Sequence, residues 1–255
     1  MEVADGDLRR RDIPVPHCFQ NVGQECPTTS GNIGQECPTS SGNIGQECPT
    51  SLLGDMSEFL DGSEEIDMHG VKLPHWQQGE VMQFVTFRLG DALPQAKLRI
   101  WKEERDIWKS HHPEPWSQDD EKEYHTRFTA QLERWLDQGA GSCIFRDTDK
   151  RLLLENILMK FQGERVEHHS WIIMPNHVHL LFRPLAPLEK LIQSWKGVSA
   201  RKLGMGSIWQ VNYRDTMIRD VRHFSNAVRY IRRNPVKLNA RHYTLWESAR
   251  AQAIE

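Results

Sequence analysis

The stretch WIIMPNHVHLLF, residues 171–182, places two apolar runs on either side of a Pro-Asn pair. Runs of this kind, rich in Ile, Val and Leu and separated by turn residues, predict two strands joined by a tight hairpin. Side chains two residues apart on a strand project from the same face. His177 and His179 are therefore expected to project together, while Val178 and Leu180 face the other way, into a core.

Further strand and helix patterns flank this hairpin. The alternating run EVMQFVTFRLG, which begins at residue 80, predicts a strand. The order strand, helices, strand, strand, helix, strand, helix is typical of an α+β fold, and we expect a ferredoxin-like antiparallel sheet with helices packed on it. Apolar stripes at helical spacing predict helices within about 95–109, 117–137, 146–161, 187–203 and 222–234.

The N-terminal third has a different character. Residues 21–51 contain three near-identical units with an 11-residue period, and each unit offers one Val or Ile to bury. Repeat architectures use longer units with an apolar face, and cysteines eleven apart do not have the short paired spacing of a zinc site. We predict that residues 1–78 form a disordered low-complexity extension and that residues 79–250 form one folded domain.

Charge divides along the same boundary. Residues 1–80 hold 4 Lys and Arg against 14 Asp and Glu, whereas residues 81–255 hold 28 against 21. A basic C-terminal part favours a polyanion partner, although a solvated basic face has the same composition. The sequence has no apolar run long enough for a membrane span and no N-terminal apolar segment, so a cytoplasmic location is expected.

The two histidines raise the question of a metal. Two neutral imidazoles that converge on one point suit a divalent cation, but ordinary half-buried strand histidines give the same pattern. A third ligand is offered by the helix predicted at 222–234. At 100° per residue, Tyr230 and Asn234 fall together on one flank of its apolar stripe. The alternative is a tyrosine at the edge of the core and an asparagine that ends the helix.

Several motifs now stand in a defined order: WIIMPNHVHLLF, SWKGVSARKLG, IWQVNYRDTMIRD, HFSNAVRYIRRNPVKLNA and LWESA. Across about residues 80–248, this order resembles the REP-associated tyrosine transposases, which are single-tyrosine members of the His-hydrophobic-His nucleases and transposases. The repeat-bearing N-terminus has no counterpart in that family. The resemblance implies that residues 79–250 are the catalytic domain of a bacterial transposase.

The resemblance also implies the roles of individual residues. His177, His179 and Asn234 would be the ligands of Mg²⁺ or Mn²⁺, and Tyr230 would be the nucleophile. The implied reaction is cleavage and rejoining of a DNA strand through a 5′-phosphotyrosine intermediate, on single-stranded or hairpin DNA formed by palindromic repeats. Related enzymes work as monomers or homodimers, and such an enzyme is expected to be associated with the nucleoid.

Basic and aromatic residues of the C-terminal part are the expected DNA contacts. Lys and Arg bind phosphates, and Trp209 and Tyr213 are predicted to stack on unpaired bases. Trp195 lies on the apolar stripe of its helix and is expected in the core. The basic candidates are Lys190, Lys196, Arg201, Lys202, Arg222, Arg229, Arg232 and Arg233.

Two alternative functions stay open at this point. The first is a domesticated protein that binds repeat DNA without cutting it. The second is a cupin-like metal enzyme, a fold that also places His-x-His on a strand but needs many short strands. No general base is identified, because His169, the candidate, has the setting of a structural strand histidine.

Overall fold

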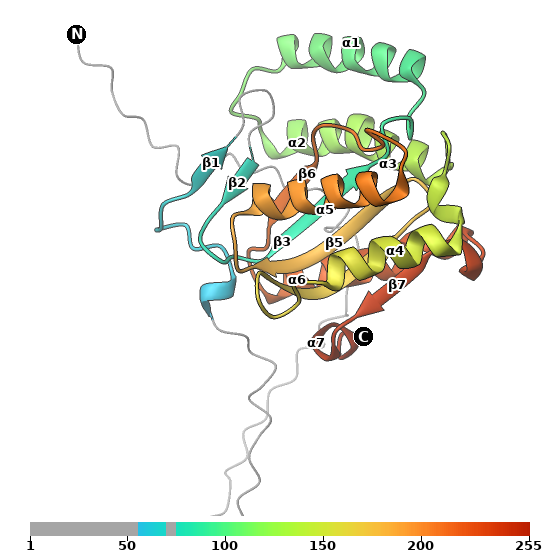
Figure 1. Ribbon diagram of the computed structural model, residues 1–255. Helices are drawn as coiled ribbons and strands as arrows, with labels where there is room; N and C mark the ends of the chain where they lie inside the picture. The colour runs from blue at the N-terminus through green and yellow to red at the C-terminus, as the bar shows by residue number, and fades with distance from the viewer. Residues whose placement is uncertain (1–55, 70–74) are drawn as a thin grey trace, which may run out of the picture.

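The computed structural model describes residues 56–69 and 75–255 (Figure 1). Its centre is a five-stranded antiparallel sheet with the strand order β6-β3-β5-β4-β7. The strands are β3 (Gln83–Arg88), β4 (Val166–Ile173), β5 (His177–Pro184), β6 (Arg214–Met217) and β7 (Thr244–Glu247). Four of them, in the order β6-β3-β5-β4, with helices between β3 and β4 and between β5 and β6, form the ferredoxin-like pattern. The predicted α+β fold is therefore confirmed, and the cupin-like alternative is wrong.

The hairpin between β4 and β5 has the predicted form. Its turn is closed by the Met174 amide, which donates to the His177 carbonyl at 2.9 Å. Val178 and Leu180 are fully buried against the helices of one face, as expected. The alternate residues of β5, which include His177 and His179, project toward the other face of the sheet.

Helices α4 (Thr148–Met159) and α5 (Leu188–Leu203) cover the first face (Figure 1). The Asp147 side chain caps α4 by accepting from the amides of residues 149 and 150, which satisfies donors that lack a partner in the first helical turn. Trp195 of α5 is buried in the apolar cluster between the helices and the sheet, as its place on the stripe predicts.

Helix α6 (Val221–Arg233) lies on the second face and packs against β4 and β5. Its N-cap, Asp220, accepts from the His223 amide at 2.7 Å. The predicted stripe of apolar residues on this helix is buried, and it shares a cluster with Phe84 of β3 and Ile172 of β4. A 3₁₀ turn, Asn234–Lys237, follows α6, and the short helix α7 (Ala249–Gln252) packs near it.

Between β3 and β4 the chain forms a helical arm, which lies at the top of Figure 1. It consists of α1 (Gln95–His111), α2 (Gln118–Tyr124), a π-helical turn (His125–Thr129) and α3 (Ala130–Asp137). The arm has its own aromatic cluster around Trp101, Trp108 and Phe128. Gly139, at φ 66°, follows α3 as the predicted glycine stop.

The boundary predicted at residue 79 is wrong for the part of the extension that the structure describes. A 3₁₀ turn (Met56–Glu58) precedes a two-stranded antiparallel sheet of β1 (Asp67–His69) and β2 (His75–Gln77). Phe59 is buried in the cluster beneath α6, and Glu58 accepts from the Arg250 Nη1 at 2.7 Å. The rest of the predicted extension, 1–55, lies outside the described residues, as do its 11-residue repeats.

Two further 3₁₀ turns, Ile144–Arg146 and Ala240–His242, complete the described elements. In the ranges 56–69 and 75–255, no helix combines the length and the apolar character that crossing a bilayer requires.

Candidate functional site

The two strand histidines lie side by side beneath α6. Their ring centroids are 4.8 Å apart, and the rings meet edge to face at 81°. His177 is 1% exposed and His179 is 3% exposed. The sequence prediction that both project from one face of β5 is therefore confirmed.

Hydrogen bonds fix the tautomer of His177. Its Nδ1 lies 2.8 Å from the Asn176 Oδ1. The Asn176 Nδ2 donates to the carbonyls of Leu136 and Ala140, at 3.2 and 3.1 Å. Because a carbonyl can only accept, the amide group of Asn176 must face the arm and its oxygen must face the ring. His177 therefore carries its proton on Nδ1 and has a lone pair on Nε2.

His179 is held in the same tautomer. Its Nδ1 lies 2.8 Å from the Thr86 Oγ1, and its Nε2 lies 3.2 Å from the Asn234 Nδ2. With the Asn234 amide in this orientation its nitrogen donates, so the His179 Nε2 accepts and its Nδ1 donates to Thr86. Both histidines thus have Nε2 as the atom with a lone pair.

Burial keeps both rings neutral. It lowers the pKa of His177 to about 3, with a smaller contribution from the positive charge of Arg88. It also lowers the pKa of His179 well below the usual value, with smaller contributions from His177 and Arg214. Only a neutral imidazole binds a metal, so both rings have the charge state that ligation requires.

Helix α6 brings the other two predicted residues to the histidines. The Tyr230 ring centroid lies 5.3 Å from that of His179, edge to face at 83°, and 5.7 Å from that of Phe84. Asn234, one turn beyond Tyr230, reaches the same histidine. Its Oδ1 is buried and has no hydrogen-bond partner among the described residues. The four predicted site residues are therefore close together.

These residues fit a divalent cation. Within the described part of the chain, no group of three His, Cys, Asp or Glu side chains lies close enough to hold a metal ion. The set offered here is different, since it combines two imidazole nitrogens with a carboxamide oxygen. A buried acceptor without a donor is costly, and a cation is a partner that satisfies it. The unpartnered Oδ1 of Asn234 favours the fit. A half-turn of the carboxamide would bring this oxygen, in place of Nδ2, toward the His179 Nε2.

Sequence comparison gives a named relative. The chain is 24% identical over 94 residues to the REP-associated tyrosine transposase of Escherichia coli (strain K12). The resemblance to the REP-associated tyrosine transposases is confirmed. The match covers 35% of this chain and 57% of that relative, so the chain spans little more than half of its length. No protein-family model matches the chain.

A solved structure is also similar to this chain. It is described as a REP-associated tyrosine transposase bound to a REP hairpin, and it is 15% identical. The match covers 66% of this chain and 74% of that one, with a TM-score of 0.34. At that score the likeness adds nothing to the fold described above.

The basic residues predicted to contact DNA fall into two groups, one exposed and one that hydrogen-bonds within the protein. The five exposed ones are Lys190, Arg201, Lys202, Arg222 and Arg233. Arg232 instead pairs with Glu247 at 3.1 Å and donates to two carbonyls of the C-terminal segment. Arg229 donates to the Glu255 carbonyl at 2.6 Å, and Lys196 donates to that of Val211 at 2.7 Å. The latter three are thus partly committed to contacts within the protein.

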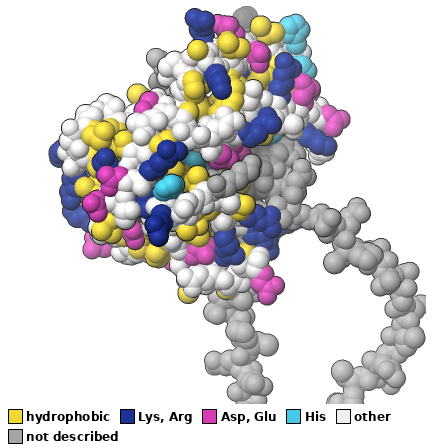
Figure 2. Space-filling model, turned by 90° about the vertical axis from the view of Figure 1, so that its right-hand side faces the viewer, with side chains coloured by type: hydrophobic (Ala, Val, Ile, Leu, Met, Phe, Trp, Pro, Cys, Tyr) yellow, Lys and Arg dark blue, Asp and Glu magenta, His cyan; other side chains and the backbone are white. Residues whose placement is uncertain are grey.

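The basic candidates also lie on two sides of the sheet. Those of α5 are on the helix that covers the face opposite the histidines, whereas those of α6 are on the same side as the site. Figure 2 shows one face of the molecule, on which Lys and Arg side chains gather in several groups with Asp and Glu side chains between them.

The predicted stacking residues are not at the surface. Trp209 is 6% exposed, its Nε1 donates to the Ser199 Oγ at 2.8 Å, and its ring packs on Phe87. Tyr213 is 9% exposed and stacks on His75, with 3.8 Å between the ring centroids. Both side chains are buried, which contradicts the prediction that Trp209 and Tyr213 stack on bases. The apolar cluster on the α5 face takes up both side chains.

Sequence reasoning missed two arginines near the histidines. Arg88 of β3 pairs with His177 in the antiparallel register, and Arg214 of β6 pairs with Thr86, which in turn pairs with His179. Residues directly opposite one another share a face of the sheet, so both arginines are on the side of the site. Arg88 follows Thr86 at a spacing of two, a signal that becomes informative only once the strand pairing is known.

His169 does not join the site. Its ring lies edge to face on Phe224, near the start of α6, with 5.4 Å between the centroids. Burial, followed by the positive charge of Arg250, lowers its pKa to about 3. Phe224 and Tyr230 are six residues apart, which is about 9 Å along a helix. A structural role for His169 is therefore favoured over that of general base.

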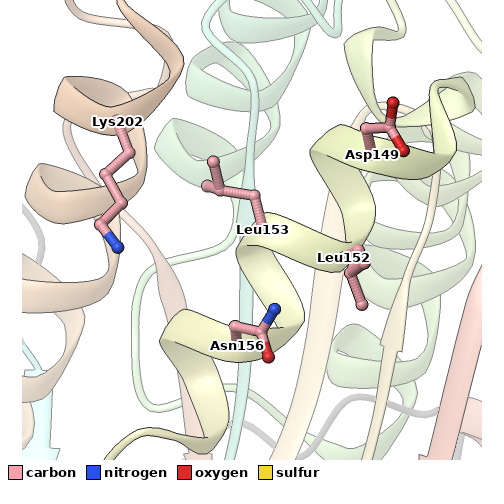
Figure 3. Close-up of a pocket in the computed structure, with 5 residues that line it drawn as sticks. All are labelled: Asp149, Leu152, Leu153, Asn156 and Lys202. Carbon is pink, nitrogen blue, oxygen red and sulfur yellow. The ribbon is translucent and has the colours of Figure 1, made fainter.

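A shallow pocket between α4 and α5 is likewise separate from the histidines. It is lined by Asp149, Leu152, Leu153, Asn156 and Lys202 (Figure 3). Its volume is about 310 Å³ and it opens widely to solvent. The pocket lies on the face of the sheet that α4 and α5 cover, opposite the histidines, so it is no part of the candidate site.

Proposed function

We propose that this protein is a metal-dependent tyrosine transposase that cleaves and rejoins single-stranded DNA, acting on hairpins formed by palindromic repeats. The observation that carries the proposal is the meeting of α6 with β5. There Asn234, with its unpartnered Oδ1, donates to His179, and the Tyr230 ring lies against the same histidine. The relative's name supports the assignment, because it is a transposase associated with REP sequences.

The metal ligands in this proposal are the Nε2 atoms of His177 and His179 and the Oδ1 of Asn234, and the ion is Mg²⁺ or Mn²⁺. When bound, such an ion withdraws charge from the non-bridging oxygens of a phosphodiester. Asn176 and Thr86 serve the site by holding the two rings in the tautomer that puts the lone pair on Nε2, and at His179 the ion would replace the hydrogen bond from the Asn234 Nδ2. Burial keeps the rings neutral, so protons do not compete for the lone pairs at neutral pH.

Tyr230 is the nucleophile of the proposed reaction. Its hydroxyl oxygen forms a bond to phosphorus while the bond from phosphorus to the 3′ oxygen breaks. The products are a 5′-phosphotyrosine and a free 3′-hydroxyl, and the phenol proton ends on the released 3′ oxygen. The covalent intermediate divides one difficult step into two and conserves the ester bond for rejoining. The contact with the His179 ring positions the phenol beside the ligand set.

The proposed substrate is a DNA strand with at least one unpaired region. Helix α6 carries the nucleophile on its partly buried flank, and the exposed Arg222 and Arg233 extend basic charge along the same helix. Phosphate contacts of this kind position a strand without reading its sequence. We propose that the enzyme works as a monomer or a homodimer in the cytoplasm.

The test is a covalent-complex assay. The protein is incubated with end-labelled hairpin oligonucleotides and Mn²⁺ and then denatured. We expect a labelled protein–DNA band with wild type and none with Tyr230→Phe, which retains the ring and removes the hydroxyl. Unchanged hairpin binding and melting temperature in the variant show that the change is confined to chemistry.

The non-catalytic alternative is decided by the same assay. Hairpin binding without a covalent band, with either Mg²⁺ or Mn²⁺, would defeat the transposase proposal and leave a repeat-DNA binding protein.

A further inference from the structure

Arg88 stands across the sheet from His177. The two residues are partners in the β3–β5 register, and Thr86, on the same side of β3, holds His179. Arg88 therefore projects from the face that carries the histidines. Its positive charge also contributes, after burial, to the low pKa of His177.

The guanidinium of Arg88 has an unusual environment for a half-buried cation. Its Nε donates to the Oε1 of Gln210, a neutral amide. Among residues 56–69 and 75–255, no carboxylate lies within ion-pair distance of it. Arg183, which is half-buried on β5, shows the usual arrangement, since it pairs with Glu58, Glu80 and Glu167.

A cation with no counter-charge is costly to bury. Desolvation is the cause of the lowered pKa of Arg88, about 10, and no acid opposes it. The side chain is still charged at neutral pH. An uncompensated buried charge destabilises a fold, and an anionic ligand relieves that cost when it binds. The bond from Nε to Gln210 orients the guanidinium plane and leaves the two Nη groups, a fork that matches two phosphate oxygens.

We propose that Arg88 is an anion-binding residue that receives a backbone phosphate of the DNA strand held over His177 and His179. The inference rests on the proposed function and adds to it a phosphate contact on β3. Arg214 lies on the same face, two strands from β5, but it has Glu133 at 3.9 Å. A phosphate competes with that carboxylate, so Arg214 is the weaker contact.

Binding of two probes without metal tests this inference. The first probe is inorganic phosphate, read as the rise in melting temperature over chloride of equal ionic strength. The second is the single-stranded oligonucleotide (dT)8 in EDTA, read as Kd against salt concentration. In (dT)8 every internal phosphodiester is equivalent, so the unknown cut position does not matter.

We expect Arg88→Gln to abolish the phosphate-dependent rise in melting temperature. The variant should also weaken (dT)8 binding about tenfold or more and lower the salt slope by about 0.7, the value for one phosphate contact on a single strand. Arg88→Lys, which keeps the charge and loses the fork, should retain the slope and recover part of the affinity. Arg183→Gln, a half-buried arginine already neutralised by acids, should change neither binding readout.

Melting temperature without anion separates binding from a structural role. Removal of an uncompensated charge should leave it unchanged or raise it in Arg88→Gln. A lower melting temperature with unchanged phosphate and (dT)8 binding would show that Arg88 only supports Gln210, and the inference would be overturned.

Failure of this inference differs from failure of the proposed function. If Arg88→Gln binds as wild type does while wild type forms the covalent band, the phosphate contact is wrong and the transposase stands. If the phosphate effect depends on Arg88 and no covalent band forms, the anion site stands and the chemistry is wrong.

Discussion

Histidines are buried on both faces of the central sheet, and their surroundings differ. On the α5 face, His168 is enclosed by aromatic rings, and its Nε2 donates to the Leu158 carbonyl at 3.1 Å. On the α6 face, His177 and His179 both donate from Nδ1, and the Asn234 amide donates to the Nε2 of His179. The first arrangement is that of a core histidine, and the second is the one that the proposed metal site requires.

The comparison shows which property marks a candidate site. Burial lowers the pKa of His168 to about 4 and that of His177 to about 3, so the direction of the pKa shift is the same on both faces. What differs is the convergence of polar side chains. An amide and a phenol approach His179, whereas the His168 ring lies among aromatic rings and hydrogen-bonds to a backbone carbonyl. A depressed histidine pKa is therefore not sufficient evidence of function.

The difference between the two faces is tested most directly by measuring metal binding in single-histidine variants. His179→Ala removes a proposed ligand, and we expect the Kd for Mn²⁺ to rise by more than about a hundredfold, beyond the loss typical of an outer-shell partner. His168→Gln, on the opposite face, should leave the Kd unchanged. Titration followed by electron paramagnetic resonance measures free Mn²⁺. Equal Kd values for the two variants would contradict the assignment of the faces.

Without metal, the buried histidines of both faces should make the free energy of unfolding fall as the pH falls. For His168 the folded-state pKa of about 4 lies below the ordinary 6.5, so its contribution to stability is complete above pH 6.5 and is lost as pH falls toward 4. The expected loss is on the order of 3 kcal/mol. Urea unfolding in EDTA between pH 7 and 4 measures it. In His168→Gln the pH slope in this window should be shallower by up to about 1.4 kcal/mol per pH unit, and an unchanged slope would refute the shift.

The hydrogen bond from His177 Nδ1 to the Asn176 side chain, which orients a proposed metal ligand, can be tested by substitution of Asn176. Asn176→Ala removes the acceptor that fixes the His177 tautomer, and we expect the Kd for Mn²⁺ to rise about 10- to 100-fold. Asn156→Ala, at an exposed position in the pocket between α4 and α5, is the matched control and should have no effect. The same resonance titration applies. A loss of melting temperature without a change in Kd would assign Asn176 to folding alone.

The smallest expected effects separate the arginines of α6. Arg222→Ala should weaken hairpin DNA binding about two- to threefold at unchanged stability, since one exposed phosphate contact contributes little. Arg232→Ala removes the bonds to Glu247, Ala251 and Ile254, and should lower the free energy of unfolding by about 1–2 kcal/mol. Fluorescence anisotropy and urea unfolding measure the two effects. The reverse pattern would restore Arg232 as a DNA contact.

Periodicity predicted the parts of the fold that depend on local pattern. The stripe on α6 placed Tyr230 and Asn234 on one flank, and the alternation around His177 and His179 placed both rings on one face. These predictions needed only the geometry of a single helix or strand. The family resemblance then supplied their proposed roles, which the structure brings within reach of one another.

The errors come from contacts that are distant in sequence. Trp209 and Tyr213 lie in a polar, loop-like stretch, so nothing local shows that the cluster on the α5 face takes up their rings. Arg88 was missed because its significance depends on pairing with a strand about ninety residues away. The acidic composition around residues 56–69 predicted disorder, yet a few residues such as Phe59 are enough to attach the segment to the domain.

That attachment has a practical consequence for anyone who trims the gene for expression. A fragment that starts at residue 79, where the composition changes, discards Phe59 and exposes the underside of the helix that bears Tyr230. It also discards Glu58, the ion-pair partner of Arg250 in the C-terminal helix. A fragment that begins at Met56, the first residue of the 3₁₀ turn, retains both contacts.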